Sequence, residues 1–117
     1  MDRYVYKIAP AELWRQAEAA GVFAGAPIDF KDGYIHLSSA AQLAETARLY
    51  FADEPAPVLI AVDAAACGPA LKWELSRGGQ PFPHLYAPLA LALVAWTAPL
   101  GRDGTGAFVL PDLETGS

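Results

Sequence analysis

The sequence has few of the residues that build disulfides and metal centres. Its 117 residues include one cysteine, Cys67, and two histidines, His36 and His84. One cysteine excludes an intramolecular disulfide, and two separated histidines with one cysteine do not form the spaced ligand set of a dedicated zinc site. The chain also lacks a G-x-S-x-G turn and a G-x-x-x-x-G-K-[ST] loop, which excludes the common hydrolase and nucleotide-triphosphatase signatures. We expect no metal site and no tightly bound cofactor.

Charge is also scarce, at 18% of the residues, whereas apolar residues make up 54%. This composition excludes a disordered chain. The net charge is −5 and the basic residues are dispersed, so long duplex nucleic acid is not an expected partner. The longest apolar stretch, residues 89–100, is about half the roughly 20 residues that a membrane helix requires. We expect no membrane segment, and a cytoplasmic setting because the first residues lack an apolar secretory signal.

Local signals divide the chain into the elements of one α+β domain over residues 1–117, without repeats or linkers. Pro10 suits the first turn of a helix and Gly21 its end, whereas Ser39 and Gln42 have the spacing of a capping box. The sequence predicts strands over residues 3–8, 34–37, 57–62, 72–76, 89–96 and 108–110, helices over residues 10–20 and from residue 39 to about residue 52, and loops over residues 23–33 and 78–88.

The strand over residues 89–96 is apolar on both faces, which is typical of a central strand. We expect a central, mainly antiparallel split sheet with two principal helices.

His36 lies at the end of a predicted strand, directly before a predicted helix. His36 and Ser38 should point to one side of the strand while Ile35 and Leu37 enter the core. The free N–H groups of the helix start, near Ser38 and Ser39, favour an anion such as phosphate beside His36. The alternative is a histidine bonded to backbone near the surface, with hydroxyls that only cap the helix.

His84 and Tyr86 lie in a predicted loop rich in proline, where a ligand-facing role and a hydrogen bond that pins the loop are both open. Glu74 is a carboxylate on a strand that is otherwise largely apolar, and it can polarise a hydroxyl or stabilise a developing cation. Its alternative role is an ion pair with Lys72 or Arg77. We expect both histidines to lie at one cleft.

The chain resembles a family of small bacterial proteins known as domain of unknown function 952. The matching segments cover most of the chain and are residues 6–8, Trp14, residues 32–38, Gln42, residues 50–51, residues 72–74, residues 83–86 and residues 88–89.

That family is in turn similar, more distantly, to the ADP-ribosyltransferase-like fold, whose members split NAD at the nicotinamide bond. The resemblance implies that His36 and Ser38 hold a ribose, that Tyr50 or Tyr86 stacks on nicotinamide, and that Glu74 polarises the acceptor. NAD is then a substrate, and the activity that of a transferase or an NAD glycohydrolase.

From these observations we expect a nucleotide or NAD-like small molecule to be bound, and in the enzymatic case transformed, in one cleft. The expected catalytic residues are His36 and Glu74, and the expected ligand-binding residues are His36, Ser38, Ser39, Tyr50, His84 and Tyr86. Two alternatives stay open at this stage. One is a non-catalytic small-molecule binding module, and the other is an interaction domain that presents Trp14, Phe82 and Tyr86 to a protein partner.

Overall fold

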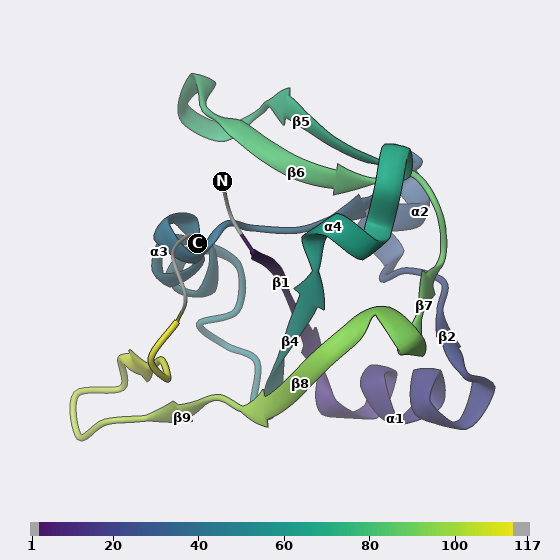
Figure 1. Cartoon of the computed structure of the whole chain (residues 1–117). Helices are drawn as coiled ribbons and strands as arrows, with labels where there is room; N and C mark the ends of the chain where they lie inside the picture. Colours follow the sequence, from purple (N-terminus) through teal and green to yellow (C-terminus); the bar gives the residue numbers. More distant parts are fainter. Residues whose placement is uncertain (1–2, 114–117) are drawn as a thin grey trace.

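The computed structural model describes residues 3–113, which form helices and short strands arranged in small sheets (Figure 1). The helices are α1 (Ala11–Ala20), α2 (Pro27–Asp32), α3 (Ala40–Tyr50) and α4 (Ala64–Cys67), with 3₁₀ turns at Gly68–Ala70, Arg77–Gly79 and Leu91–Leu93. The strands are β1 (Tyr4–Pro10), β2 (Val22–Phe23), β3 (Ile35–His36), β4 (Pro57–Asp63), β5 (Leu71–Leu75), β6 (Pro81–Leu85), β7 (Leu89–Ala90), β8 (Val94–Pro99), β9 (Gly101–Arg102) and β10 (Phe108–Val109). No helix in this part of the chain is long and apolar enough to cross a membrane.

Two three-stranded antiparallel sheets form the frame, with strand orders β1-β4-β8 and β3-β6-β5. The strands β2 and β7, and β9 and β10, form two smaller antiparallel pairs. A bridge joins the large sheets, because Tyr6 and Ser38 each donate a backbone N–H to the carbonyl of the other at 2.8 Å. Figure 1 shows the β5–β6 hairpin above β4 and β8, with α1 at the opposite side. The bridge thus brings β3, which carries His36, next to β1.

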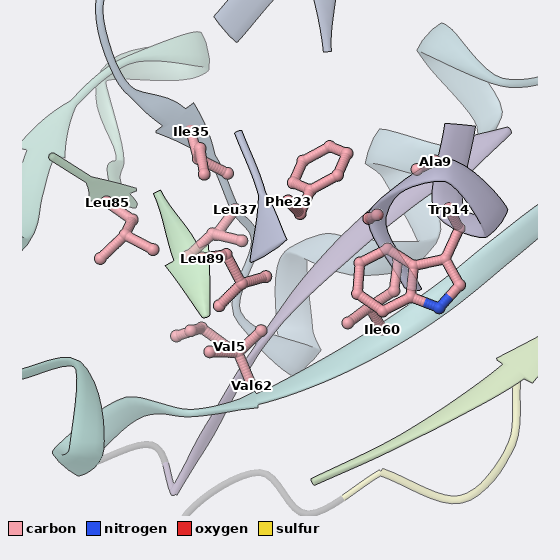
Figure 2. Packing of buried hydrophobic residues seen from close by; sticks show 11 residues of the cluster. Val5, Ala9, Trp14, Phe23, Ile35, Leu37, Ile60, Val62, Leu85 and Leu89 are labelled. Carbon is pink, nitrogen blue, oxygen red and sulfur yellow. The ribbon is translucent and has the colours of Figure 1, made fainter. Parts of the chain in front are cut away.

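Alternate side chains of β1 and β4 enter two separate hydrophobic cores. Val5 and Val62 lie in the first core and Tyr6 and Leu59 in the second, because successive side chains of a strand point to opposite faces. The helix α3 covers the second core. The first core also holds side chains from α1, β2, β3, β6 and β7, as Figure 2 shows, so it ties the two large sheets together.

The two principal helices have the ends that the sequence predicts. The helix α1 follows Pro10 and ends at Gly21, which has a φ of 81° in the left-handed region that glycine tolerates. The helix α3 starts with the predicted capping box, in which Ser39 Oγ accepts from the N–H of Gln42 and Gln42 Oε1 accepts from the N–H of Ser39. Strands also lie near residues 3–8, 57–62, 72–76 and 108–110, as predicted.

The predicted loop over residues 23–33 contains a third main helix, α2, so the expectation of two principal helices is wrong. Pro27 occupies the first turn of α2, where its missing N–H costs nothing, and the Asp29 carboxylate accepts from the N–H of Ala26. Gly33 ends the helix in the left-handed region, with a φ of 88°. The same residue types favour turns and helix ends, and here they mark the two ends of a short helix.

The predicted loop over residues 78–88 contains β6, the middle strand of its sheet. Alternate residues of a strand turn their backbone groups to opposite neighbours. The carbonyl of Pro83 accepts from Leu37 on the side of β3, so the missing N–H of Pro83 faces that side as well. Because β3 is only two residues long, the proline costs little pairing there, while Phe82 and His84 pair with β5.

The prediction of one central strand over residues 89–96 is wrong. This segment is divided into β7, a 3₁₀ turn at Leu91–Leu93, and β8, which lies at the edge of its sheet. Ala90, Ala92 and Ala95 are exposed, and alanine on a strand face does not demand burial as leucine does. The α+β class therefore holds, but several small antiparallel sheets and three main helices replace one central split sheet.

We predict that Ser39→Ala lowers the free energy of unfolding by about 0.5–2 kcal/mol, because it removes the acceptor for the N–H of Gln42. Ser39→Gly is the matched control, and it should cost only a few tenths of a kcal/mol because glycine is tolerated at a helix N-cap. Urea denaturation of the three proteins measures the difference. Equal losses for both variants would contradict a capping role.

Candidate functional site

A cavity of about 720 Å³ lies between β1, α2, α3 and the β3–β6 pair. Much of its wall is apolar and comes from residues such as Ile8, Leu13, Pro27 and Phe51. The polar part of the wall includes Tyr34, His36, Ser38, Thr46, Arg77 and His84. This volume, with a few polar groups in an apolar surround, is typical of sites for small molecules.

The two histidines lie side by side in this wall. In the antiparallel pair of β3 and β6, His36 is directly opposite His84, and their ring centroids are 5.8 Å apart. The ring of Tyr34 stacks on His84 at 4.0 Å and lies 4.6 Å from His36. The prediction that both histidines lie at one cleft is confirmed, while their role in binding or catalysis remains a prediction.

Behind His36 lies the buried carboxylate of Asp29, which accepts from donors on β1, on β3 and at the residue before α2. It accepts from the ring Nδ1 of His36 at 2.7 Å, from the backbone N–H of His36 at 3.0 Å and from that of Ala26 at 2.8 Å. It also pairs with the ammonium of Lys7 on β1 at 3.0 Å. The alternation of β1 places Lys7 on the same face as Val5 and therefore inside the protein.

The pKa values of this pair report how the two charges are held. Burial alone raises the pKa of Asp29, but the hydrogen bond from His36, the charge of Lys7 and the two backbone N–H groups outweigh it and lower the pKa to about 2. Burial lowers the pKa of Lys7, and the charge and hydrogen bond of Asp29 offset only part of that effect. The carboxylate is the better satisfied of the two because it has more partners.

The other ring nitrogen of His36, Nε2, lies 2.9 Å from the carboxylate of Asp32 at the end of α2. Both nitrogens of this half-buried ring are therefore bonded to carboxylates, and neither is bonded to backbone. The alternative of a histidine ring bonded to backbone near the surface is therefore wrong about the partners of the ring. Two such hydrogen bonds exist together only when both nitrogens carry a proton, because a carboxylate accepts and does not donate.

Glu74 lies behind His84 and does not line the cavity. Its carboxylate accepts from Nδ1 of His84 at 2.8 Å and from the phenol of Tyr86 at 2.7 Å. The hydrogen bonds from Tyr86 and His84 hold the pKa of Glu74 below its usual value, and the bond to Glu74 raises the pKa of Tyr86 to about 12. Within residues 3–113, neither Lys72 nor Arg77 is paired with Glu74, so the ion pair considered from the sequence is not formed.

The hydroxyl groups near α3 divide between the cap and the cavity. Ser39 does not line the cavity and its hydroxyl caps α3, whereas Ser38 lines it and bonds Thr46 at 3.0 Å. Arg77 donates to Thr46 at 3.3 Å, and its guanidinium lies 5.6 Å from the ring centroid of Tyr50. Serine, threonine, tyrosine and arginine thus converge at one part of the wall.

Two further predictions concern surfaces and metals. Trp14 and Phe82 are only 5% and 7% exposed, because both belong to buried faces, so they cannot be presented to a protein partner as considered from the sequence. Tyr86 is 43% exposed. In the described part of the chain, no group of three or more histidine, cysteine, aspartate or glutamate side chains is arranged to hold a metal ion.

Comparison with known protein families gives a match over most of the chain. The model of the family described as "Protein of unknown function (DUF952)" matches residues 8–97. The chain belongs to this family. The fold of this family member is similar to that of protein CC0527 from Caulobacter crescentus. The crystal structure of CC0527 is 44% identical, with a TM-score of 0.86 over 91% of this chain and 93% of that chain. Its solution NMR structure is 45% identical, with a TM-score of 0.78 over 89% and 90% of the two chains. The comparison with curated proteins finds no match.

Sequence reasoning missed the groups that hold the histidines in this family member. Lys7, Asp32 and Tyr34 lie in segments that carry the resemblance, so their position in those segments was a usable signal. Asp29 gave no such signal, because it lies in the segment predicted as a loop. Its partners are 22 and 7 residues away along the chain, and no local pattern pairs them.

We predict that Asp29 makes the fold sensitive to acid. Its pKa is lower in the folded protein than the ordinary 3.8, so its contribution is complete above about pH 4 and is lost as the pH falls through about 2. This difference between the two pKa values corresponds to roughly 2 kcal/mol in the free energy of unfolding. The double variant Lys7→Met, Asp29→Asn removes both buried charges and should lose about that much less stability than the wild type between pH 4 and pH 2.

The measurement is the free energy of unfolding in urea at several pH values, with the exposed Asp53→Asn as a control for loss of one carboxylate. The control should follow the wild-type curve. A double variant whose stability falls as steeply with acid as that of the wild type would show that Asp29 contributes nothing to it.

Proposed function

We propose that this protein binds a nucleotide of the NAD type in the 720 Å³ cavity and cleaves its nicotinamide bond. The observation that carries the proposal is the shared wall. One part of the cavity wall is the pair of histidines with Tyr34 stacked on it, and another part is the cationic Arg77. The cavity therefore offers surfaces for both a flat ring and a phosphate.

The aromatic part of the wall suits a planar heterocycle. Tyr34 and His84 form a stacked pair, and Tyr50 lines the cavity beside the guanidinium of Arg77. Aromatic and imidazole faces bind flat rings by offset stacking, which adds about 0.5–1.5 kcal/mol to the area that they bury. The ring centroid of Tyr86 lies 5.2 Å from that of Tyr34, but Tyr86 does not line the cavity.

The hydroxyl and cationic part of the wall suits a ribose phosphate. Ser38 and Thr46 line the cavity and can bond ribose hydroxyls, with His36 beside them. Arg77 has no carboxylate partner among residues 3–113, so its fork of N–H groups remains available to a phosphate. The start of α3 at Ser39 adds the partial positive charge of a helix N-terminus.

The proposal includes the ADP-ribosyltransferase-like relation and its chemistry. Two bridged three-stranded antiparallel sheets, with His36 at the end of β3 and Ser38 at the bridge two residues later, support it. Transfer of ADP-ribose and hydrolysis of NAD both begin with loss of nicotinamide. Of the two catalytic residues expected from the sequence, His36 lines the cavity, whereas Glu74 contacts His84 from outside it. The single cysteine is consistent with the proposed cytoplasmic setting.

We predict that Arg77→Gln weakens NAD binding by about 10- to 100-fold, because it removes a charged hydrogen bond to phosphate worth roughly 1.5–3 kcal/mol. Arg48→Gln is the matched control, since Arg48 is exposed on α3 and does not line the cavity. Its affinity for NAD should equal that of the wild type.

Isothermal titration calorimetry of the three proteins with NAD measures the affinities. Chromatographic detection of free nicotinamide then separates an enzyme from a binding module that has no activity. Absence of binding by the wild type at millimolar NAD would overturn the proposal, and equal weakening by Arg77→Gln and Arg48→Gln would remove Arg77 from it.

A further inference from the structure

The two histidines of the cavity differ in how many of their ring nitrogens already have a partner. Both nitrogens of His36 face carboxylates, whereas His84 bonds Glu74 through Nδ1 only. Among residues 3–113, Nε2 of His84 has no hydrogen-bond partner. The side chain of His84 is only 4% exposed and lines the cavity. A ring nitrogen that is nearly buried and has no protein partner is available to a ligand in the cavity.

Glu74 determines which nitrogen of His84 carries the proton. A carboxylate accepts hydrogen bonds and cannot donate them, so Nδ1 is the donor and the neutral ring keeps its lone pair on Nε2. Tyr86 donates to the same oxygen of Glu74 and so fixes the carboxylate in place. Tyr34 covers one face of the imidazole at 4.0 Å. These contacts orient a basic nitrogen within the cavity wall.

We propose that His84 is the general base of the cavity and that Glu74 and Tyr86 are the residues that position it. This inference rests on the proposed function. In the step that we propose, a water molecule gives a proton to Nε2 of His84 while its oxygen forms a bond to C1′ of the ribose. The bond from C1′ to the nicotinamide nitrogen breaks, and its electron pair stays on that nitrogen. The products are ADP-ribose, nicotinamide and the proton that His84 later releases.

His36 is unsuited to the same task because Asp29 and Asp32 occupy both of its nitrogens. Glu74 is unsuited to direct contact because it does not line the cavity. Four other groups lie around His84. His36 is opposite it on β3, and Tyr34 stacks on its ring. Lys72 is opposite it on β5, and Tyr86 shares the carboxylate of Glu74 with it. The ring of Tyr86 lies 5.3 Å from the ammonium of Lys72, so that cation is held near the phenol that fixes Glu74.

The first test needs no ligand. Because the chain has two histidines, ¹⁵N NMR of histidine-labelled protein at neutral pH resolves both rings, and His36→Gln assigns them. In the neutral ring we expect His84 to carry its proton on Nδ1 and to have an unprotonated Nε2. In Glu74→Gln the amide can donate as well as accept, so the two tautomers of His84 should become mixed. A wild-type His84 with its proton on Nε2 would overturn the proposal.

The second test measures nicotinamide release and NAD affinity in the same variants. We expect His84→Asn to release nicotinamide about 10²- to 10⁴-fold more slowly while its affinity for NAD changes little. Glu74→Gln and Tyr86→Phe should slow release by successively smaller factors, because each acts on His84 through one more contact. Thermal unfolding of every variant shows whether it is folded, and Arg48→Gln, which lies on the exposed side of α3 and outside the cavity, is the control for an unrelated substitution.

The outcomes separate this inference from the proposed function. Wild-type protein that fails to bind NAD overturns the proposed function, and the ¹⁵N spectrum still decides the arrangement of His84. Wild-type protein that binds NAD without releasing nicotinamide overturns both the role of His84 and the cleavage part of the proposed function, and leaves binding intact. Folded His84→Asn that releases nicotinamide at the wild-type rate overturns the role of His84 alone.

Discussion

The buried carboxylate of Asp29 is the contact on which the geometry of the cavity depends. One side chain on α2 bonds the ammonium of Lys7 on β1 and both the backbone and the ring of His36 on β3. A buried charge without partners costs several kcal/mol, so these three elements hold one relative position in the folded protein. The ammonium of Lys7 also donates to the carbonyl of His36, which links β1 and β3 a second time.

The pairing of β3 with β6 then decides what the cavity contains. Because His36 and His84 are opposite each other, a shift of one residue in register would turn one of them to the core face. Ile35 and Leu85, which are the neighbouring pair, fill the first core and so prevent such a shift. The hydrophobic core thus fixes the register, and the register sets the separation of the two imidazoles.

Local chemistry in the sequence was enough for the elements that carry their own signals. Pro10 and Gly21 mark the ends of α1, and Ser39 with Gln42 marks the start of α3, because helix ends are set by backbone groups within one turn. The alternation of side chains about His36 also predicted that Ile35 and Leu37 are buried, as they are. Proline and glycine occur in loops but also at helix ends and in strands, so the prediction of loops failed at α2 and β6.

The sequence by itself determined the α+β class, the two longest helices and the position of both histidines at one cleft. Only the tertiary structure decided which carboxylate each histidine meets. Asp29 and Glu74 hold His36 and His84 from 7 and 10 residues away, across elements that chain-local patterns do not relate. It also decided that Trp14 and Phe82 are buried and that Arg77 and Tyr50 lie at the same cavity. The physical reason is that charge pairing and burial depend on how sheets and helices pack against one another, whereas sequence spacing governs only neighbours within one element.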